Sequence, residues 1–222
     1  MAVVHTERIG AIGYLTLSRP DRLNAMGKAF WTELPAAVAE LDADPEVRVI
    51  VMRAEGRHFS AGLDLTEANA LFDDGRSPAE RNMRLFTHIK ELQRSFQSLD
   101  RCSTPTVAAI HGACIGGGVD LVAACDIRIC SADASFSIRE TKIAIVADLG
   151  SLQRLPSLIP RSALMELALT GRDFDAMEAL QWGFVSKVCE SHDMLVSHAE
   201  KVAEEIASNS PLVTLGVRRL LR

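Results

Sequence analysis

Short runs of apolar and β-branched residues recur through the first two thirds of the chain. Residues 12–17 (IGYLTL) stop before Pro20, and residues 47–52 (VRVIVM) have the composition of a buried strand. The same pattern predicts these strands: 12–17, 47–52, 106–110, 127–130 and 134–138. The first two thirds of the chain are therefore expected to contain a sheet.

Helical periodicity lies between these runs and dominates the last third of the chain. In residues 78–102, apolar residues recur at steps of four and three and form one stripe: Leu85, Ile89, Leu92, Phe96 and Leu99. Further helices are predicted at 28–41, 150–159, 162–169, 176–182, 193–208 and 211–221. This order predicts an α/β fold, with a core in residues 1–150 and a helical region in residues 151–222.

Composition and charge exclude several classes of partner. Hydrophobic residues make up 48% of the chain and charged residues 24%, as in a globular protein with a real core. The net charge of -5 argues against nucleic acid and anionic membranes, which would require clustered Lys and Arg. No apolar run is long enough to span a membrane, and the start of the chain lacks the pattern of a signal peptide. A cytoplasmic location is expected.

The cysteines and histidines do not suggest a metal site. The five cysteines form no CxxC pair, and the six histidines lack metal-ligand spacing. We expect reduced, mostly buried thiols at these positions: Cys102, Cys114, Cys125, Cys130 and Cys189. No metal is expected.

The first segment with possible chemistry is 56–65 (GRHFSAGLDL), which follows a predicted strand and precedes a predicted helix. Ala61 and Gly62 are small, so a ligand could approach the backbone closely. Free N–H groups at such a turn can bind an anion or a polarised carbonyl. The alternative is an ordinary turn in which Asp64 only supplies a charge at the start of the helix.

The second segment is 111–120 (HGACIGGGVD), where three consecutive glycines follow a strand and open an apolar helix. Gly116 to Gly118 leave backbone N–H groups uncovered, although the spacing is neither GxGxxG nor a P-loop. Asp120 is predicted in the first helical turn. There it could act chemically or merely complement the helix dipole.

The third segment is 137–150 (SIRETKIAIVADLG). Glu140 closes a strand-like run, and Asp148 follows eight residues later, just before Gly150. Each acid also has an ordinary explanation, because Glu140 could be a solvated surface group and Asp148 a helix cap. Ser60 lacks the G-x-S-x-G elbow of a serine nucleophile. His58, His111 and Cys114 are interpreted as structural.

Together these segments resemble the enoyl-CoA hydratase/isomerase (crotonase) family over nearly the whole chain. The similar stretches are 17–26 (LSRPDRLNAM), 58–65, 111–136, 139–156 and 168–188. The resemblance implies a spiral of ββα repeats followed by C-terminal helices that drive assembly into a homotrimer or a dimer of trimers. The C-terminal region is expected to be shorter than in relatives, and Ala144 replaces a residue that is often Gly.

The resemblance also implies an acyl-CoA thioester as the substrate, with no cofactor beyond the coenzyme A that the substrate carries. The thioester oxygen is expected to bind the backbone N–H groups of Leu63 and Gly117, an oxyanion hole. The implied substrate-binding residues are Ser60, Ala61, Leu63, Asp64, Leu65 and Gly117. Leu71, Phe72 and Phe86 could line the acyl pocket, and residues 72–78 are expected to form a flexible loop.

The acidic residues indicate the reaction. In hydratases of the family two glutamates share one water, and they fall at positions 120 and 140. The set Asp120, Glu140 and Asp148 looks instead like that of the Δ3,5-Δ2,4-dienoyl-CoA isomerases of fatty acid β-oxidation. This similarity suggests Glu140 as the base near C2 and Asp148 as the acid near C6, with Asp120 tuning Glu140. The alternatives are a 2-enoyl-CoA hydratase and a non-catalytic scaffold with the same fold.

Overall fold

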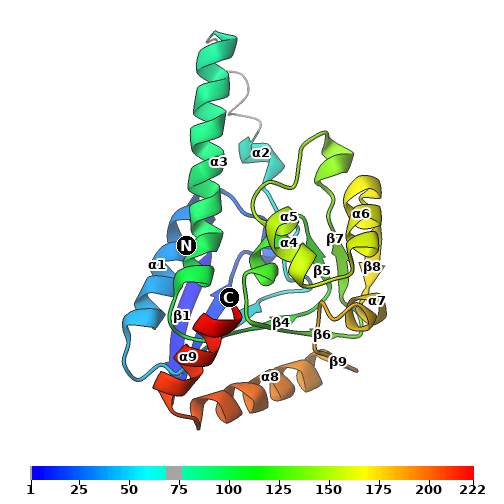
Figure 1. Ribbon diagram of the computed structural model, residues 1–222. Coiled ribbons are helices and arrows are strands. Elements are labelled where there is room, and N and C mark those ends of the chain that lie inside the picture. Colours follow the sequence, from blue (N-terminus) through cyan, green and yellow to red (C-terminus); the bar gives the residue numbers. More distant parts are fainter. Residues whose placement is uncertain (1, 69–76) are drawn as a thin grey trace.

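The computed structural model describes residues 2–68 and 77–222, and within them the chain builds two sheets (Figure 1). The larger has the strand order β1-β2-β3-β4-β6-β9, and only β1 and β2 in it are antiparallel. Its strands are β1 (Val4–Ile9), β2 (Ile12–Leu17), β3 (Val49–Ala54), β4 (Thr106–Ile110), β6 (Ile127–Ser131) and β9 (Lys187–Cys189). The smaller sheet contains β5 (Ala113–Ile115), β7 (Ser135–Ser137) and β8 (Asp173–Asp175).

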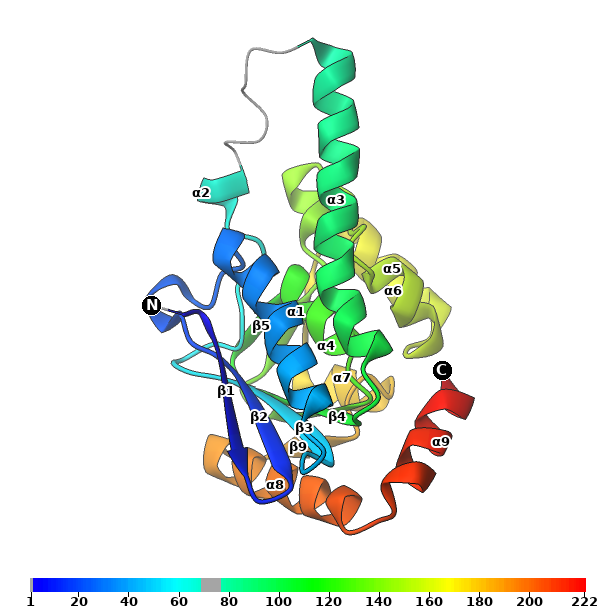
Figure 2. The same cartoon turned by 90° about the vertical axis from the view of Figure 1, so that its left-hand side faces the viewer.

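Helices cover both faces of the larger sheet (Figure 2). On one face, α1 (Lys28–Ala43) packs on α3 (Pro78–Arg101), and on the other α8 (His192–Ala207) contacts β3, β4 and β6. Alternation along β3 divides its side chains between two cores: Val49 and Val51 join Leu195 of α8, whereas Ile50 and Met52 join the larger core. Because both faces are buried, the strand reads as a continuous apolar run.

The remaining helices lie mostly toward the C-terminus. The α-helices are α2 (Leu65–Ala68), α4 (Gly117–Ala123), α5 (Ser151–Arg154), α6 (Arg161–Thr170), α7 (Ala176–Gln181) and α9 (Pro211–Leu221). Short 3-10 helices are η1 (Pro20–Arg22), η3 (Glu140–Ile143) and η4 (Leu155–Ser157). No helix in the described part of the chain is long and apolar enough to cross a membrane.

The predicted stripe on α3 is confirmed at its C-terminal half, where Leu92, Phe96 and Leu99 are buried. The N-terminal half extends beyond the body of the molecule (Figure 1), so Leu85 and Ile89 are only partly buried. A capping box of Ser77 and Glu80 starts the helix. Hence residues 77 and 78 of the expected loop belong to the start of α3, while residues 72–76 lie outside the described range.

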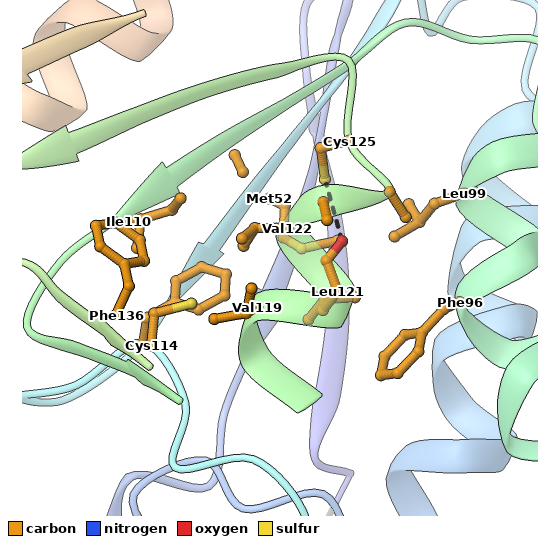
Figure 3. Close-up of a cluster of buried hydrophobic side chains, with 14 of the residues drawn as sticks. Met52, Phe96, Leu99, Ile110, Cys114, Val119, Leu121, Val122, Cys125 and Phe136 are labelled. Carbon is orange, nitrogen blue, oxygen red and sulfur yellow. Dashed lines mark hydrogen bonds between the residues drawn. The ribbon is translucent and has the colours of Figure 1, made fainter. Parts of the chain in front are cut away.

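Buried helix α4 lies at the centre of the larger core (Figure 3). Every residue from Gly117 to Ala123 is buried. Leu121 lies toward Phe96 of α3, whereas Val119 lies on the side of Phe136 (Figure 3). A polar side chain on this helix is therefore removed from water.

Two predictions about the last third need correction. The chain there is not only helical, because β8 pairs with β7 and β9 pairs with β6. These strands have three residues each, too few to show an alternating pattern. The helix expected at 150–159 is divided into α5 and η4, with Pro156 inside the second. The boundary at residue 150 stays a prediction, although strands from beyond it complete both sheets.

Candidate active site

The turn at residues 58–65 is held between two other segments of backbone. Ser60 donates its backbone N–H to Ala113 at 3.0 Å and accepts from Ile115 at 2.9 Å, which joins the turn to β5. Its fully buried hydroxyl donates to the Asn24 carbonyl at 2.9 Å and accepts from the Gly62 N–H at 3.1 Å. The turn is therefore fixed from both sides.

Two glycines bring this turn against the start of α4. Gly62 has φ +82, and a Cβ there would lie 2.6 Å from the Ile115 carbonyl oxygen and 3.1 Å from the Gly117 nitrogen. A Cβ on Gly117 would lie 3.7 Å from the nitrogen of Leu63. The two predicted donors, Leu63 and Gly117, thus lie side by side.

The surrounding backbone bonds leave both of these N–H groups unpaired within the described chain. A parallel bridge between Met26 and Leu63 uses the Gly62 carbonyl and the Asp64 N–H, so the N–H of Leu63 itself is not consumed. Gly117 is the first residue of α4, where N–H groups have no partner within the helix. Nothing in residues 2–68 and 77–222 accepts a hydrogen bond from either group.

Asp120 projects from α4 into a dry environment. Its side chain is fully buried, and Oδ1 accepts hydrogen bonds from the backbone N–H and the hydroxyl of Ser151, the latter at 2.7 Å. Oδ2 has no partner among the described residues. Burial raises the pKa of Asp120 to about 6, and the Ser151 hydrogen bonds and the charge of Arg154 only partly oppose this effect.

Glu140 reaches the glycine turn from η3. A Cβ on Gly116 would lie 3.0 Å from Oε1 of Glu140, so this carboxyl group abuts the N-terminal end of α4. Its Oε2 is buried and has no partner within the described chain. Burial, followed by the charges of Asp120 and Asp148, raises the pKa of Glu140 to about 7. The surface-acid interpretation of Glu140 is therefore wrong.

Asp148 is half-buried in the turn that leads into α5. Its carbonyl accepts a hydrogen bond from the Gln93 side chain of α3 at 2.7 Å. The helix cap of α5 is Gly150, with φ +137, so the interpretation of Asp148 as the cap is also wrong. Desolvation raises the pKa of Asp148, and its charge acts on both Asp120 and Glu140.

Comparison with known proteins shows the family and the fold of the chain. Residues 7–221 match the family described as enoyl-CoA hydratase/isomerase. The chain belongs to this family. An enoyl-CoA hydratase from Bacillus anthracis has a crystal structure that matches with a TM-score of 0.88 and 28% identity, covering 99% of this chain and 82% of that one. The predicted crotonase fold is thereby confirmed.

More similar sequences within the enoyl-CoA hydratase/isomerase family carry a narrower name. The peroxisomal Delta(3,5)-Delta(2,4)-dienoyl-CoA isomerase of Arabidopsis thaliana is 42% identical over 100% of this chain and 81% of its own length. The mitochondrial protein of the same name from Homo sapiens is 41% identical over 90% of this chain and 62% of its own length. The chain thus spans less than two thirds of the human relative.

The other predicted binding residues of this crotonase divide into two groups. Ser60 and Asp64 are buried, whereas Ala61 and Leu65 are exposed. Asp64 pairs with Arg19 at 2.8 Å, and hydrogen bonds from Thr66 lower the pKa of Asp64. Direct contact with a substrate is therefore easier for Ala61 and Leu65, while the buried pair holds the turn. Binding by any of them stays a prediction.

The histidines beside the glycine turns have structural roles, as predicted. His58 accepts the Ala113 N–H on Nδ1 at 3.1 Å, and His111 bonds the Gly56 carbonyl through Nε2 at 2.9 Å. Cys114 is fully buried, and burial raises the pKa of its thiol. No group of His, Cys, Asp and Glu able to hold a metal ion is found among the described residues.

Sequence reasoning missed two residues that support the site. Asn24 has φ +53 and donates its side-chain amide to the carbonyls of Glu55 and His58, both at 2.9 Å. Asparagine tolerates positive φ, which was an available signal in the stretch 17–26. Ser151 carried no such signal, because its partner Asp120 lies 31 residues away.

Of the three residues predicted to line the acyl pocket, the structure describes one, Phe86. Leu71 and Phe72 lie outside the described range. Phe86 lies on the projecting half of α3 and is 58% exposed, so it does not belong to the core. Its contact with an acyl chain stays a prediction.

Proposed function

We propose that this crotonase isomerises 3,5-dienoyl-CoA to 2,4-dienoyl-CoA in fatty acid β-oxidation. The observation that carries the proposal is the set of three carboxyl groups, Asp120, Glu140 and Asp148. All have raised pKa values, and they interact with one another beside the free N–H groups of Leu63 and Gly117. Relatives that are 39–44% identical and bear the name dienoyl-CoA isomerase support it.

Binding would place the thioester oxygen against the two backbone donors. Removal of a proton from C2 builds negative charge on this oxygen, and the N–H groups of Leu63 and Gly117 stabilise that charge without rearranging. Loss of one such donor costs about 2.7–4 kcal/mol of transition-state stabilisation in comparable sites. The donors are uncharged, so the net negative charge of the chain is no obstacle.

Proton transfer would then use two acids at opposite ends of the diene. The carboxylate of Glu140 takes the C2 proton, and the electron pair of that C–H bond extends the conjugated system onto the thioester oxygen. The carboxyl group of Asp148 gives its proton to C6, and the double bonds finish at C2–C3 and C4–C5. Glu140 is then protonated and Asp148 ionised, and exchange with solvent restores both.

The pKa values fit these assignments. A base works best when its pKa lies near the working pH, and the pKa of Glu140 is about 7. Desolvation favours the protonated form of Asp148, as an acid requires. One short side chain cannot easily reach both C2 and C6. Asp148 is therefore needed at C6 in addition to Glu140 at C2.

The rival function is hydration of a 2-enoyl-CoA by Asp120 and Glu140. It is favoured by the structural similarity to an enoyl-CoA hydratase. It gives Asp148 no role, although burying a carboxyl group is costly. A non-catalytic scaffold would have no use for any of the three acids.

An assay with two substrates separates these possibilities. The purified protein is incubated with a 3,5-dienoyl-CoA while the ultraviolet absorbance of the 2,4-dienoyl product is followed, and hydration of a 2-enoyl-CoA is measured in parallel. Rapid isomerisation with weak hydration is expected. Hydration without isomerisation would identify the protein as a hydratase. Absence of both activities, together with binding of a macromolecular partner, would favour the scaffold.

The expected homotrimer or dimer of trimers is likewise a proposal. It is supported by large apolar side chains that α9 leaves exposed: Leu212, Val213, Val217, Leu220 and Leu221. Light scattering after size exclusion should give a mass of three or six chains, and a monomer would contradict the proposal. The cytoplasmic location and the absence of a separate cofactor stay predictions.

A further inference from the structure

Ser151 makes an unusual double contact with the buried acid of α4. Both its backbone N–H and its hydroxyl donate to the same oxygen, Oδ1 of Asp120, although 31 residues separate the two in the chain. Ser151 is 1% exposed and Asp120 is not exposed at all, so water does not compete for these bonds. The second oxygen, Oδ2, is left without a partner among the described residues.

The turn that presents Ser151 is itself anchored. Gly150 precedes it with φ +137, and a Cβ at Gly150 would collide with the Nη1 of Arg154 at 1.6 Å. The same guanidinium group forms an ion pair with Asp100 near the end of α3. Helix α5 also packs against α4. Ser151 is therefore held in place by contacts other than its own bonds to Asp120.

The charges around Asp120 come from several elements. Glu140 and Asp148 approach from the segment after β7, Arg154 belongs to α5, and Cys114 belongs to β5. Burial raises the pKa of Cys114, which keeps this thiol neutral. Arg154 and the Ser151 donors thus favour the ionised form of Asp120, against desolvation and the neighbouring acids.

We propose that Ser151 is a positioning residue of the site, which holds one oxygen of Asp120 and keeps that carboxylate ionised, so that its charge strengthens Glu140 as a base. The base role of Glu140 rests on the proposed function. The ionisation of Asp120 and Glu140 does not, because it follows from the hydrogen bonds and the burial of the two side chains. Ser151 itself touches no substrate in this proposal.

Substitution Ser151→Ala removes the hydroxyl donor and leaves the N–H in place. The pKa of Asp120 should rise, so that Asp120 is neutral over more of the pH range. The pKa of Glu140 should then fall, because the negative charge of Asp120 that raises it is lost. In a plot of kcat/KM against pH, the acid limb is expected to move to lower pH by about half to one unit. The rate on the plateau should fall by about 3- to 10-fold, because a weaker base transfers the proton less well.

Two matched variants separate this effect from a loss of packing. Ser157→Ala removes an exposed hydroxyl that bonds the Arg154 carbonyl at 2.8 Å, and it should change neither the limb nor the plateau. Ser151→Thr keeps the hydroxyl and should return the limb to the wild-type position. A plateau that falls in Ser151→Ala while the limb stays fixed would mean a merely structural role and would overturn the proposal.

A direct titration makes the test independent of turnover. Glutamate carrying a ¹³C label in its side-chain carboxyl is incorporated, the Glu140 signal is assigned with Glu140→Gln, and its pKa is measured in wild type and Ser151→Ala. A lower pKa in the variant supports the positioning role even if 3,5-dienoyl-CoA is not turned over, in which case only the proposed function fails. An unchanged pKa overturns the proposal, whether or not the enzyme isomerises a 3,5-dienoyl-CoA.

Discussion

Burial and two neighbouring carboxylates all favour the protonated form of Glu140. Its pKa rises to about 7 from a reference of 4.5, because desolvation disfavours the charge and Asp120 and Asp148 repel it. A folded chain with such a group binds its proton more tightly than the unfolded chain does. The stability that this proton provides is present below about pH 4.5 and is lost as the pH rises through about 7.

Glu140→Gln should therefore stabilise the protein at alkaline pH while it stops the reaction. Glutamine is neutral at every pH. The free energy of unfolding of the variant should therefore exceed that of wild type by about 1–3 kcal/mol at pH 8, and the two should be similar at pH 4. Thermal unfolding at both pH values measures the difference. Glu190→Gln, at an exposed position, is the control and should show no such gain. An equal gain at both pH values would contradict the electrostatic explanation.

Asp148 offers the complementary test of proton donation. Asp148→Asn keeps the size of the side chain but removes the acidic proton, so isomerisation should fall by about 10²- to 10⁴-fold. Binding of the acyl-CoA, measured by calorimetry, should change little, because the expected oxyanion donors are backbone groups. Asp193→Asn on α8, which covers the opposite face of the sheet, should keep full activity. Full activity in Asp148→Asn would reject the proposed acid.

At the scale of elements, long periodic segments were predictable and short paired ones were not. Strands β2 and β4 coincide with their predictions at 12–17 and 106–110, because each is a complete apolar run. Strand β9, in contrast, exists because β6 offers it hydrogen bonds, a tertiary cause that three residues cannot show. The site follows the same division. The sequence indicated Asp120, Glu140 and Asp148, but only the packing of α5 on α4 brings Ser151 to Asp120.

The contact between the 58–65 turn and α4 can be tested with one methyl group. In Gly62→Ala the new Cβ would press on the Ile115 carbonyl and the Gly117 nitrogen, and it would separate the two proposed oxyanion donors. Activity should fall by about 10²- to 10³-fold, the loss expected for one such donor. The measurement is kcat/KM for the 3,5-dienoyl-CoA.

Gly10→Ala is the matched control for this substitution. Gly10 also has positive φ, +59, but nothing lies within 4 Å of its added Cβ. Both variants should lose about 1–2 kcal/mol of stability because alanine is strained at positive φ. Gly62→Ala should lose more stability, because its Cβ also presses on backbone atoms, and only Gly62→Ala should lose activity. An equal loss of activity in both would show that backbone strain, rather than separation of the donors, is responsible.

At the scale of the whole molecule, one buried arginine joins the C-terminal helix to the body. Arg218 of α9 donates to the Leu99 carbonyl at 2.6 Å and to the Cys102 carbonyl, at the end of α3. It also pairs with Asp126 at 2.8 Å, whose carboxylate in turn accepts from the N–H and hydroxyl of Thr106. Helix α9 lies beside the lower end of α3 in Figure 1. Arg218 thus ties the last helix to α3, β4 and the start of β6, and Arg222 adds bonds to Asp126 and to the Ala124 carbonyl.

Replacing this arginine should release α9 without unfolding the sheet. Arg218→Met removes the Arg218 donor to the Cys102 carbonyl and one of the two guanidinium partners of Asp126, which keeps Arg222. The loss should be roughly 2 kcal/mol, the low end for a buried charge pair. Amide hydrogen exchange in α9 (Pro211–Leu221) should rise to the level of a frayed terminus, while β3 and β4 stay protected. Arg219→Met makes the same change of charge at an exposed position and should leave α9 protected. Equal exchange in the two variants would mean that apolar contacts of α9, and not the Arg218 anchor, hold it in place.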